Sequence, residues 1–194
     1  MVSVRAIGAG DWELVRDVRL AELRDSPDAF ASTYAREAAY TEEQWRGWFS
    51  DRFAMFFAYI PDRAEPAGLT GVFDRDDEAA LVSMWVRPDA RGHGVGEALV
   101  SAAAGWAKSR DAGTLYLWVA EANHSARRLY ERCGFTPTGE RQPLPSHPDV
   151  AEIRMRRSLL RLSSRPRSPG SGPVVHTSPA VSCCYQPDFM SRQA

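Results

Sequence analysis

The sequence predicts a mixed α/β domain built on a mostly antiparallel sheet, and three observations support this fold class. Three apolar segments, residues 55–60, 68–74 and 79–86, are joined by short polar turns, which is typical of an antiparallel meander. A glycine-rich loop then leads into a segment with apolar residues at helical spacing. The apolar segment 114–119 follows that helix, so a helical crossover should place it parallel to segment 79–86.

The remaining elements can be assigned in chain order. Residues 2–7 predict a short first strand. Asp11 is expected to cap a helix that ends before Pro27. Thr41 begins a capping box, and the aromatic residues behind it are expected to lie in the core. We expect these two helices to lie at the edge of the sheet and to form a wall of the substrate cleft.

The C-terminal part predicts one more helix and two more strands. Asn123 should cap the helix, and Gly134 should end it in a left-handed conformation. Strands are predicted at 135–141 and 150–159, separated by a proline-rich loop at 142–148. The full prediction is seven strands and about four helices.

The chain is predicted to form one domain followed by a tail. Its 194 residues are enough for one well-buried α/β domain. This domain is assigned to residues 1–161. Residues 162–194 are rich in serine and proline and have little apolar periodicity, so a disordered tail is predicted there.

Composition excludes several classes of function. The net charge of −1 gives no basic surface for nucleic acid or an anionic membrane. The three cysteines, Cys133, Cys183 and Cys184, lack C-x-x-C spacing, so neither a zinc site nor a disulfide framework is expected. No metal is predicted. The chain has no apolar run of about 18 residues, and its first residues do not resemble a signal peptide. A cytoplasmic protein is therefore expected.

The glycine-rich loop at residues 91–96 predicts a phosphate site. Its glycines let the backbone approach a ligand closely, because no Cβ intervenes. A helix that begins in such a loop directs unpaired N–H groups and a partial positive charge outward. The loop is not of the Walker type, because Gly96 is followed by Glu97 instead of lysine. Its glycine spacing also differs from the Rossmann pattern.

Two motifs resemble those of one enzyme family. The pattern R-x-x-G-x-G, formed by Arg91, Gly94 and Gly96, resembles the pyrophosphate loop of the GCN5-related N-acetyltransferases. Residues 123–135 match N-x-x-A-x-x-x-Y-x-x-x-G-F, which is similar to the second cofactor segment of this family. The resemblance covers roughly residues 2–159. It implies a seven-stranded sheet whose central parallel strands splay apart beyond the V-x-P sequence at 86–88.

The resemblance also implies a set of residues for acetyl-CoA. The splayed strands expose backbone groups that pantetheine can pair with, as an added strand would. The glycine loop should hold the pyrophosphate mainly through backbone N–H groups. The residues expected to bind acetyl-CoA are Met84, Trp85, Val86, Arg91, Gly92, His93, Gly94, Val95, Gly96 and Asn123. His93 is expected to face solvent and to have no catalytic role.

Tyr130 stands where the family has its general acid. A phenol with an ordinary pKa of about 10 is protonated at neutral pH and can donate to a departing thiolate. A main-chain N–H at residues 84–86 is expected to stabilise the oxyanion. Relatives often have a glutamate five residues before the motif asparagine, where this chain has Trp118. The base therefore stays open, and a water relay to Glu121 or Ser83 is one route.

The resulting prediction is an N-acetyltransferase that transfers the acetyl group of acetyl-CoA to a primary amine of a small molecule or peptide. The amine would attack directly, through a tetrahedral intermediate. Two alternatives remain: a non-catalytic acyl-CoA-binding sensor, favoured by Trp118, and a module that binds ATP in its glycine loop. The sequence does not identify the acceptor, and it leaves a homodimer open.

Overall fold

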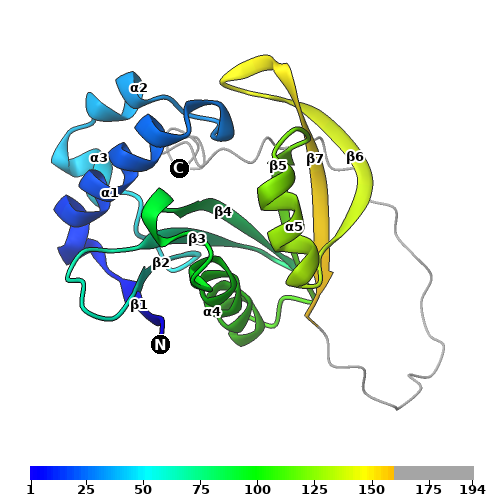
Figure 1. Cartoon of the computed structure of the whole chain (residues 1–194), viewed down its shortest axis with the longest axis horizontal. Coiled ribbons are helices and arrows are strands. Elements are labelled where there is room, and N and C mark those ends of the chain that lie inside the picture. Colours follow the sequence, from blue (N-terminus) through cyan, green and yellow to red (C-terminus); the bar gives the residue numbers. More distant parts are fainter. Residues whose placement is uncertain (160–194) are drawn as a thin grey trace.

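A computed structural model describes residues 1–159, whose strands form one sheet in the order β1-β2-β3-β4-β5-β7-β6 (Figure 1). The strands are β1 (Ser3–Ile7), β2 (Phe53–Tyr59), β3 (Gly68–Arg75), β4 (Glu78–Val86), β5 (Thr114–Ala120), β6 (Thr136–Leu144) and β7 (His147–Ser158). All neighbours are antiparallel except β4 and β5. The predicted mixed, mostly antiparallel sheet of seven strands is confirmed. The predicted tail at 162–194 and the boundary at 161 lie outside the described residues.

Helices cover both faces of the sheet (Figure 1). They are α1 (Trp12–Asp25), α2 (Tyr34–Ala38), α3 (Glu42–Arg46), α4 (Val95–Ser109) and α5 (His124–Arg132). Alternate residues of β2 belong to two separate cores, because successive strand side chains point to opposite faces. Met55 and Phe57 lie in the core that includes residues of α1 and α3, whereas Phe56 and Ala58 share a core with α4.

The parallel strands β4 and β5 are paired over only part of their length. Their register runs from Glu78 opposite Thr114 to Ala80 opposite Tyr116 and then stops. Beyond Ala80, β4 stays paired with β3, and β5 stays paired with β7. A gap therefore opens inside the sheet. The predicted splay is confirmed, but it begins well before the V-x-P sequence.

A bulge in β4 accounts for the early opening. The register between β3 and β4 shifts between Leu69 and Gly71, so Ser83 and Met84 on β4 stand opposite one residue of β3. Ser83 has a φ of +48°, in the left-handed region that non-glycine residues rarely occupy. Such bulges bend a strand and increase its twist, which carries β4 away from β5.

Two of the three predicted N-caps, Thr41 and Asn123, are present. Thr41 Oγ1 accepts from the Gln44 N–H at 3.3 Å, and Gln44 Oε1 accepts from the Thr41 N–H at 2.8 Å, which completes the capping box of α3. The predicted cap by Asp11 is wrong, because its side chain makes no cap hydrogen bond. A short 3-10 turn, Ala9–Asp11, precedes α1, and Asp11 Oδ2 accepts from the Gly8 N–H of that turn at 3.2 Å.

The prediction of a proline-rich loop at 142–148 is also wrong, because most of these residues belong to strands. Strands β6 and β7 continue through most of it, with Pro143 opposite Ala151, and only residues 145–146 form the turn. Strand β6 is the outermost of the sheet on this side. An edge strand tolerates proline, because a missing N–H on its outer side removes no ladder hydrogen bond.

Gly68 lies where β3, β4 and α4 meet, and we expect Gly68→Ala to lower the free energy of unfolding by about 2 kcal/mol. A Cβ there would lie 2.5 Å from the Trp85 carbonyl oxygen and 3.2 Å from Val95 Cγ1. The carbonyl belongs to a paired strand and cannot move aside. Gly105→Ala in α4, where an added Cβ meets nothing within 4 Å, is the control. Urea unfolding that gives the two variants equal stability would contradict the prediction.

Candidate active site

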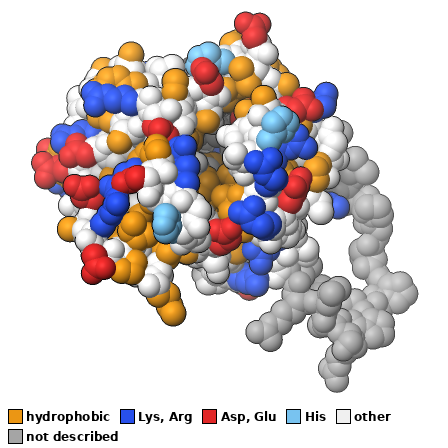
Figure 2. All heavy atoms as spheres, in the orientation of Figure 1, with side chains coloured by type: hydrophobic (Ala, Val, Ile, Leu, Met, Phe, Trp, Pro, Cys, Tyr) orange, Lys and Arg blue, Asp and Glu red, His pale blue; other side chains and the backbone are white. Residues whose placement is uncertain are grey.

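A groove of about 870 Å³ lies between the end of β4, the beginning of α4 and the helix α5. Figure 2 shows the hollow at the centre of this face, with hydrophobic side chains inside it and basic side chains around it. Of the ten residues predicted to bind acetyl-CoA, nine line the groove: Met84, Trp85, Val86, Arg91, Gly92, Gly94, Val95, Gly96 and Asn123. The structure does not place His93 among them; its side chain is exposed, and its Nδ1 lies 3.0 Å from the Arg91 carbonyl oxygen.

The glycine loop needs its glycines for two different reasons. Gly92 and Gly94 have φ values of +81° and +77°, and an added Cβ would meet nothing within 4 Å. Glycine is favoured there by the backbone conformation. Gly96 is crowded, because an added Cβ would lie 2.7 Å from Leu129 Cδ2. Since glycine has no Cβ, α4 and α5 can approach each other at this point.

The beginning of α4 is open toward ligands. Its N-cap, Gly94, provides no side-chain cap. The first N–H groups of a helix have no partner within the helix, and together with the helix dipole they favour an anion. Because Gly94 and Gly96 line the groove, this part of the groove is suited to a phosphate group.

Asp25, at the end of α1, fixes the glycine loop to β4. Its Oδ2 accepts from Trp85 Nε1 at 2.8 Å and from Arg91 Nη2 at 2.7 Å. Partial burial opposes the charge of Asp25, but hydrogen bonds from Trp85, Ser26 and Arg91 outweigh burial and hold its pKa below the ordinary value. Arg91 Nε also donates to the Val86 carbonyl at 3.0 Å. The guanidinium of Arg91 thus binds both Asp25 and the Val86 carbonyl.

A smaller inner cavity of about 110 Å³ continues from the groove between the splayed strands. Met84, Asn123 and Tyr130 line both spaces. Tyr130 is only 5% exposed, and its ring meets Phe135 edge to face with the centroids 5.8 Å apart. Asn123 caps α5, with its Oδ1 accepting from the Ala126 N–H at 3.1 Å, as predicted.

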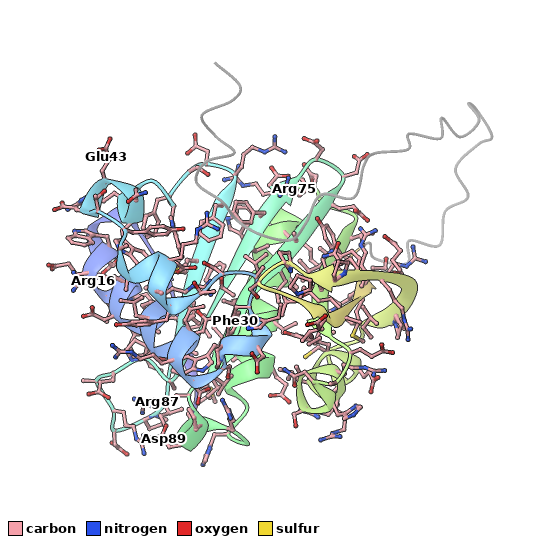
Figure 3. The ribbon with its side chains drawn as sticks, turned by 90° about the horizontal axis from the view of Figure 1, so that it is seen from above. Arg16, Phe30, Glu43, Arg75, Arg87 and Asp89 are labelled. Atoms are coloured by element: carbon pink, nitrogen blue, oxygen red, sulfur yellow. The ribbon has the colours of Figure 1, made fainter. Side chains whose placement is uncertain are left out.

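The two sides of the gap are joined above the inner cavity. In Figure 3, Phe30 lies between the N-terminal helices and the hairpin of β6 and β7. Ser146, in the turn of that hairpin, donates from Oγ to the Phe30 carbonyl at 2.5 Å. Nearby, His147 Nε2 lies 3.3 Å from Asp28 Oδ1. Arg19 of α1 and Trp48, which follows α3, line the inner cavity. These two helices pack on one face of the sheet, however, and do not lie at its edge as predicted. The segment that contains Phe30 also bridges to the C-terminal hairpin.

A buried ion cluster forms one side of the inner cavity. Arg19 donates to Glu37 at 2.8 and 2.9 Å and to Glu22 at 2.8 Å. These three residues are 5%, 2% and 0% exposed. Burial raises the pKa of Glu22 to about 7, although Arg19 works in the opposite direction. Arg19 also donates to Ser83 Oγ at 3.2 Å and so holds the bulge of β4.

Glu152 on β7 brings a further carboxylate to the inner cavity. It is 6% exposed, and its Oε2 accepts from Gln142 Nε2 at 3.2 Å. Burial raises the pKa of Glu152, and the hydrogen bond from Gln142 moves it partly back. Glu152 was not among the residues predicted for the site, because only the pairing of β5 with β7 brings it near the motif at residues 123–135.

Three tryptophans line the site, and two of them, Trp48 and Trp85, also belong to the buried core. Trp118 and Trp48 line the inner cavity, and Trp85 lines the groove. Trp45 is buried in the core and lines neither space. Among residues 1–159 there is no group of three or more His, Cys, Asp or Glu side chains placed to hold a metal ion. The helices of this described region are all too short or too polar to span a membrane.

Residues 18–135 match the family model described as the acetyltransferase (GNAT) family. The chain belongs to this family. The matched GNAT region contains α4, β5 and α5 together with the whole glycine loop, so the family match and the groove involve the same part of the chain.

Several known proteins are similar to this GNAT chain. It is 27% identical over 128 residues to a protein of Bacillus subtilis (strain 168) provisionally named [ribosomal protein bS18]-alanine N-acetyltransferase, covering 66% of this chain and 83% of the relative. It is 32% identical over 124 residues to the mycothiol acetyltransferase of Geodermatophilus obscurus, covering 59% of this chain but only 40% of the relative. The structure of yncA from Salmonella typhimurium with acetyl-CoA has the same fold, with a TM-score of 0.67 and 14% identity over 87% of this chain and 99% of that one.

Proposed function

We propose that this GNAT protein is an N-acetyltransferase that transfers the acetyl group of acetyl-CoA to a primary amine of a small molecule or a peptide. One observation carries the proposal. The gap between β4 and β5 connects an open helix N-terminus at one end with a small cavity lined by Tyr130, Glu37 and Glu152 at the other. Two relatives are named [ribosomal protein bS18]-alanine N-acetyltransferase, a provisional name, and mycothiol acetyltransferase, and both names agree with acetyl transfer.

The volume of the groove, about 870 Å³, and the open beginning of α4 support acetyl-CoA as its ligand. The backbone amides of residues 92–96 would hold its pyrophosphate, since the nearby cations Arg91 and Arg132 already bind Asp25 and Glu97. The main chain of Met84–Val86 would pair with the pantetheine amides along the gap. Acetyl-CoA, when bound, supplies the acetyl group as a thioester that an amine attacks directly, through a tetrahedral intermediate.

Tyr130 is the proposed proton donor. It lies where the groove and the inner cavity meet. A tyrosine hydroxyl with an ordinary pKa of about 10 is protonated at neutral pH and can donate a proton to the sulfur of the leaving group. A main-chain N–H between Met84 and Val86 would stabilise the negative charge on the carbonyl oxygen.

The inner cavity favours a small cationic group. Its volume of about 110 Å³ admits only the amine-bearing end of an acceptor. Its lining includes Glu37, Glu152 and Arg19, and the positive charge of Arg19 is already bound by Glu22 and Glu37. The remaining negative charge attracts an ammonium group. A small amine or a peptide N-terminus can present such a group without entering the cavity as a whole.

Titration calorimetry with acetyl-CoA and with ATP tests the binding of the cosubstrate. Acetyl transfer is tested by measuring the release of CoA thiol with a panel of amines: ethylamine, lysine, spermidine, alaninamide and glycinamide. We expect binding of acetyl-CoA in preference to ATP, and release of CoA with at least one amine. Preferential binding of ATP would contradict the proposal. Binding of acetyl-CoA without CoA release for any amine would favour the non-catalytic sensor.

We expect Gly94→Ala to weaken acetyl-CoA binding about tenfold, because a left-handed conformation costs a residue with a Cβ about 1 to 2 kcal/mol. The loop would relax toward negative φ and turn its N–H groups away from the groove. Gly139→Ala is the matched control: Gly139 has a φ of +90° in β6 and does not line the groove. Calorimetry should show the loss of affinity only for Gly94→Ala, and equal affinities would contradict the assignment of the loop.

A further inference from the structure

Glu152 is a buried carboxylate that projects into the inner cavity. In the antiparallel pairing of β5 with β7, Glu152 stands directly opposite Ala120. Side chains of directly paired residues lie on the same face of a sheet, and that face also carries Trp118, two residues before Ala120. All three residues line the inner cavity. The small side chain of Ala120 leaves space over which the longer side chain of Glu152 can extend.

The surroundings of Glu152 leave its charge uncompensated within the described part of the chain. Its carboxylate takes one hydrogen bond, from the neutral amide of Gln142. The neighbouring cations each have carboxylate partners of their own. Arg19 binds Glu22 and Glu37. Arg141 binds Glu121. Arg154 binds Glu78 and Glu140. A buried carboxylate without a cation is well suited to receive one from a ligand.

We propose that Glu152 receives the ammonium group of the acceptor and takes up its proton. This inference rests on the proposed N-acetyltransferase function and assigns its base. Tyr130 and Glu152 line the same small cavity, so a nitrogen atom bound there has access to both a proton acceptor and a proton donor. The raised pKa of Glu152 supports the assignment, because a carboxylate with a pKa nearer neutrality is a stronger base.

The proton and electron balance of the step is complete. The ammonium gives one proton to Glu152 and keeps the electron pair of the N–H bond. That pair forms the C–N bond to the acetyl carbon, and the C–S bond breaks with its electrons on sulfur. The sulfur takes a proton from Tyr130. Glu152 then loses its proton to solvent, the amide nitrogen loses its second proton, and Tyr130 regains one, so that one proton is released for each turnover.

The test uses the full-length protein with Glu152→Gln, which keeps the size of the side chain and removes the proton acceptor. With ethylamine we expect kcat/KM at pH 7 to fall about 100-fold, within the range for removal of a general base. The fall should be smaller with glycinamide, because an α-amino group has a pKa near 8 and an alkylamine one above about 10. Calorimetric binding of acetyl-CoA should not change. Glu140→Gln, which alters an exposed carboxylate that does not line the cavity, is the control.

The pH profile separates a base from a structural residue. For the wild type we expect kcat/KM to rise as Glu152 loses its proton, whereas for Glu152→Gln it should follow the deprotonation of the free amine. Gln142→Met keeps the carboxylate and removes the hydrogen bond that lowers its pKa, so the rise should move to higher pH. This variant tests the proposal even if Glu152→Gln does not fold.

Two results would overturn the assignment. One is a Glu152→Gln protein whose kcat/KM has the same pH profile as the wild type. The other is a Gln142→Met protein whose kcat/KM rises at the same pH as in the wild type. A different result would indicate that the proposed function itself is wrong. In that case the wild type would bind acetyl-CoA and release no CoA with any amine of the panel, and the role of Glu152 as a base would be rejected with it.

Discussion

Replacing Arg19 with methionine is expected to lower the free energy of unfolding by about 3 to 5 kcal/mol, the range found when one partner of a buried ion pair is removed. The substitution leaves the carboxylates of Glu22 and Glu37 buried without a cation. It also removes the hydrogen bond to Ser83 that holds the bulge of β4. Urea unfolding of both proteins measures the change.

The loss should depend on pH in a defined direction. The pKa of Glu22 is raised from 4.5 to about 7, so between these values the folded state binds a proton that the unfolded state does not. The contribution of Glu22 to stability is therefore present at low pH and is lost as pH rises through about 7. Without Arg19, which lowers the pKa of Glu22, the Glu22 carboxyl should stay neutral to higher pH. We therefore expect the variant to lose less stability at pH 5 than at pH 8.

Arg46→Met is the matched control for this prediction. Arg46 forms an exposed pair with Glu42, one helical turn away, at 2.7 Å. Exposed pairs of this kind contribute about 0.3 to 0.5 kcal/mol. If Arg19→Met and Arg46→Met destabilise the protein equally, the buried cluster contributes no more than a surface pair, and our account of it is wrong.

Tyr130→Phe is expected to lower kcat and kcat/KM together by about 100-fold, because the hydroxyl acts only when the thiol departs. The ring remains and keeps its edge-to-face contact with Phe135. Affinity for acetyl-CoA should be unchanged. Steady-state release of CoA with the best amine of the panel measures the rates, and calorimetry measures the affinity.

Tyr59→Phe provides the corresponding control. Tyr59 lies on β2, where its hydroxyl accepts from Arg5 Nη2 at 3.4 Å, and it lines neither the groove nor the inner cavity. Its removal should leave turnover unchanged. A Tyr130→Phe protein with wild-type kcat would show that another group, or water, protonates the sulfur.

The parts of the site that depend on contiguous backbone were predictable from the sequence. The loop from Arg91 to Gly96 offers main-chain amides in a conformation that glycine permits, so residue type and spacing are enough to recognise it. The capping box of Thr41 and the N-cap of Asn123 are likewise local, since each involves residues at most three positions apart. Apolar segments joined by short turns predicted the sheet for the same reason.

Errors arose where a neighbouring element competes with a local preference. Asp11 has the residue type of a cap, but the preceding 3-10 turn takes its carboxylate. The three prolines at 143, 145 and 148 predicted a loop, but only Pro145 lies in the turn. Pro143 lies in the edge strand β6, which tolerates it, and Pro148 lies at the beginning of β7. The sheet opens earlier than the V-x-P sequence indicates, because the bulge at Ser83 depends on pairing with β3.

Local pattern in this chain was enough for the order of elements and for the glycine-rich loop, whereas the role expected of Tyr130 came from the resemblance of residues 123–135 to the family motif. The charged part of the site required the folded molecule, because its members come from distant segments. Asp25 meets Trp85 across 60 positions, Arg19 meets Ser83 across 64, and Glu152 meets Ala120 through the register of β5 and β7. Such contacts are set by how helices and strands pack and pair, and a shift of one residue in register would turn Glu152 to the opposite face of the sheet.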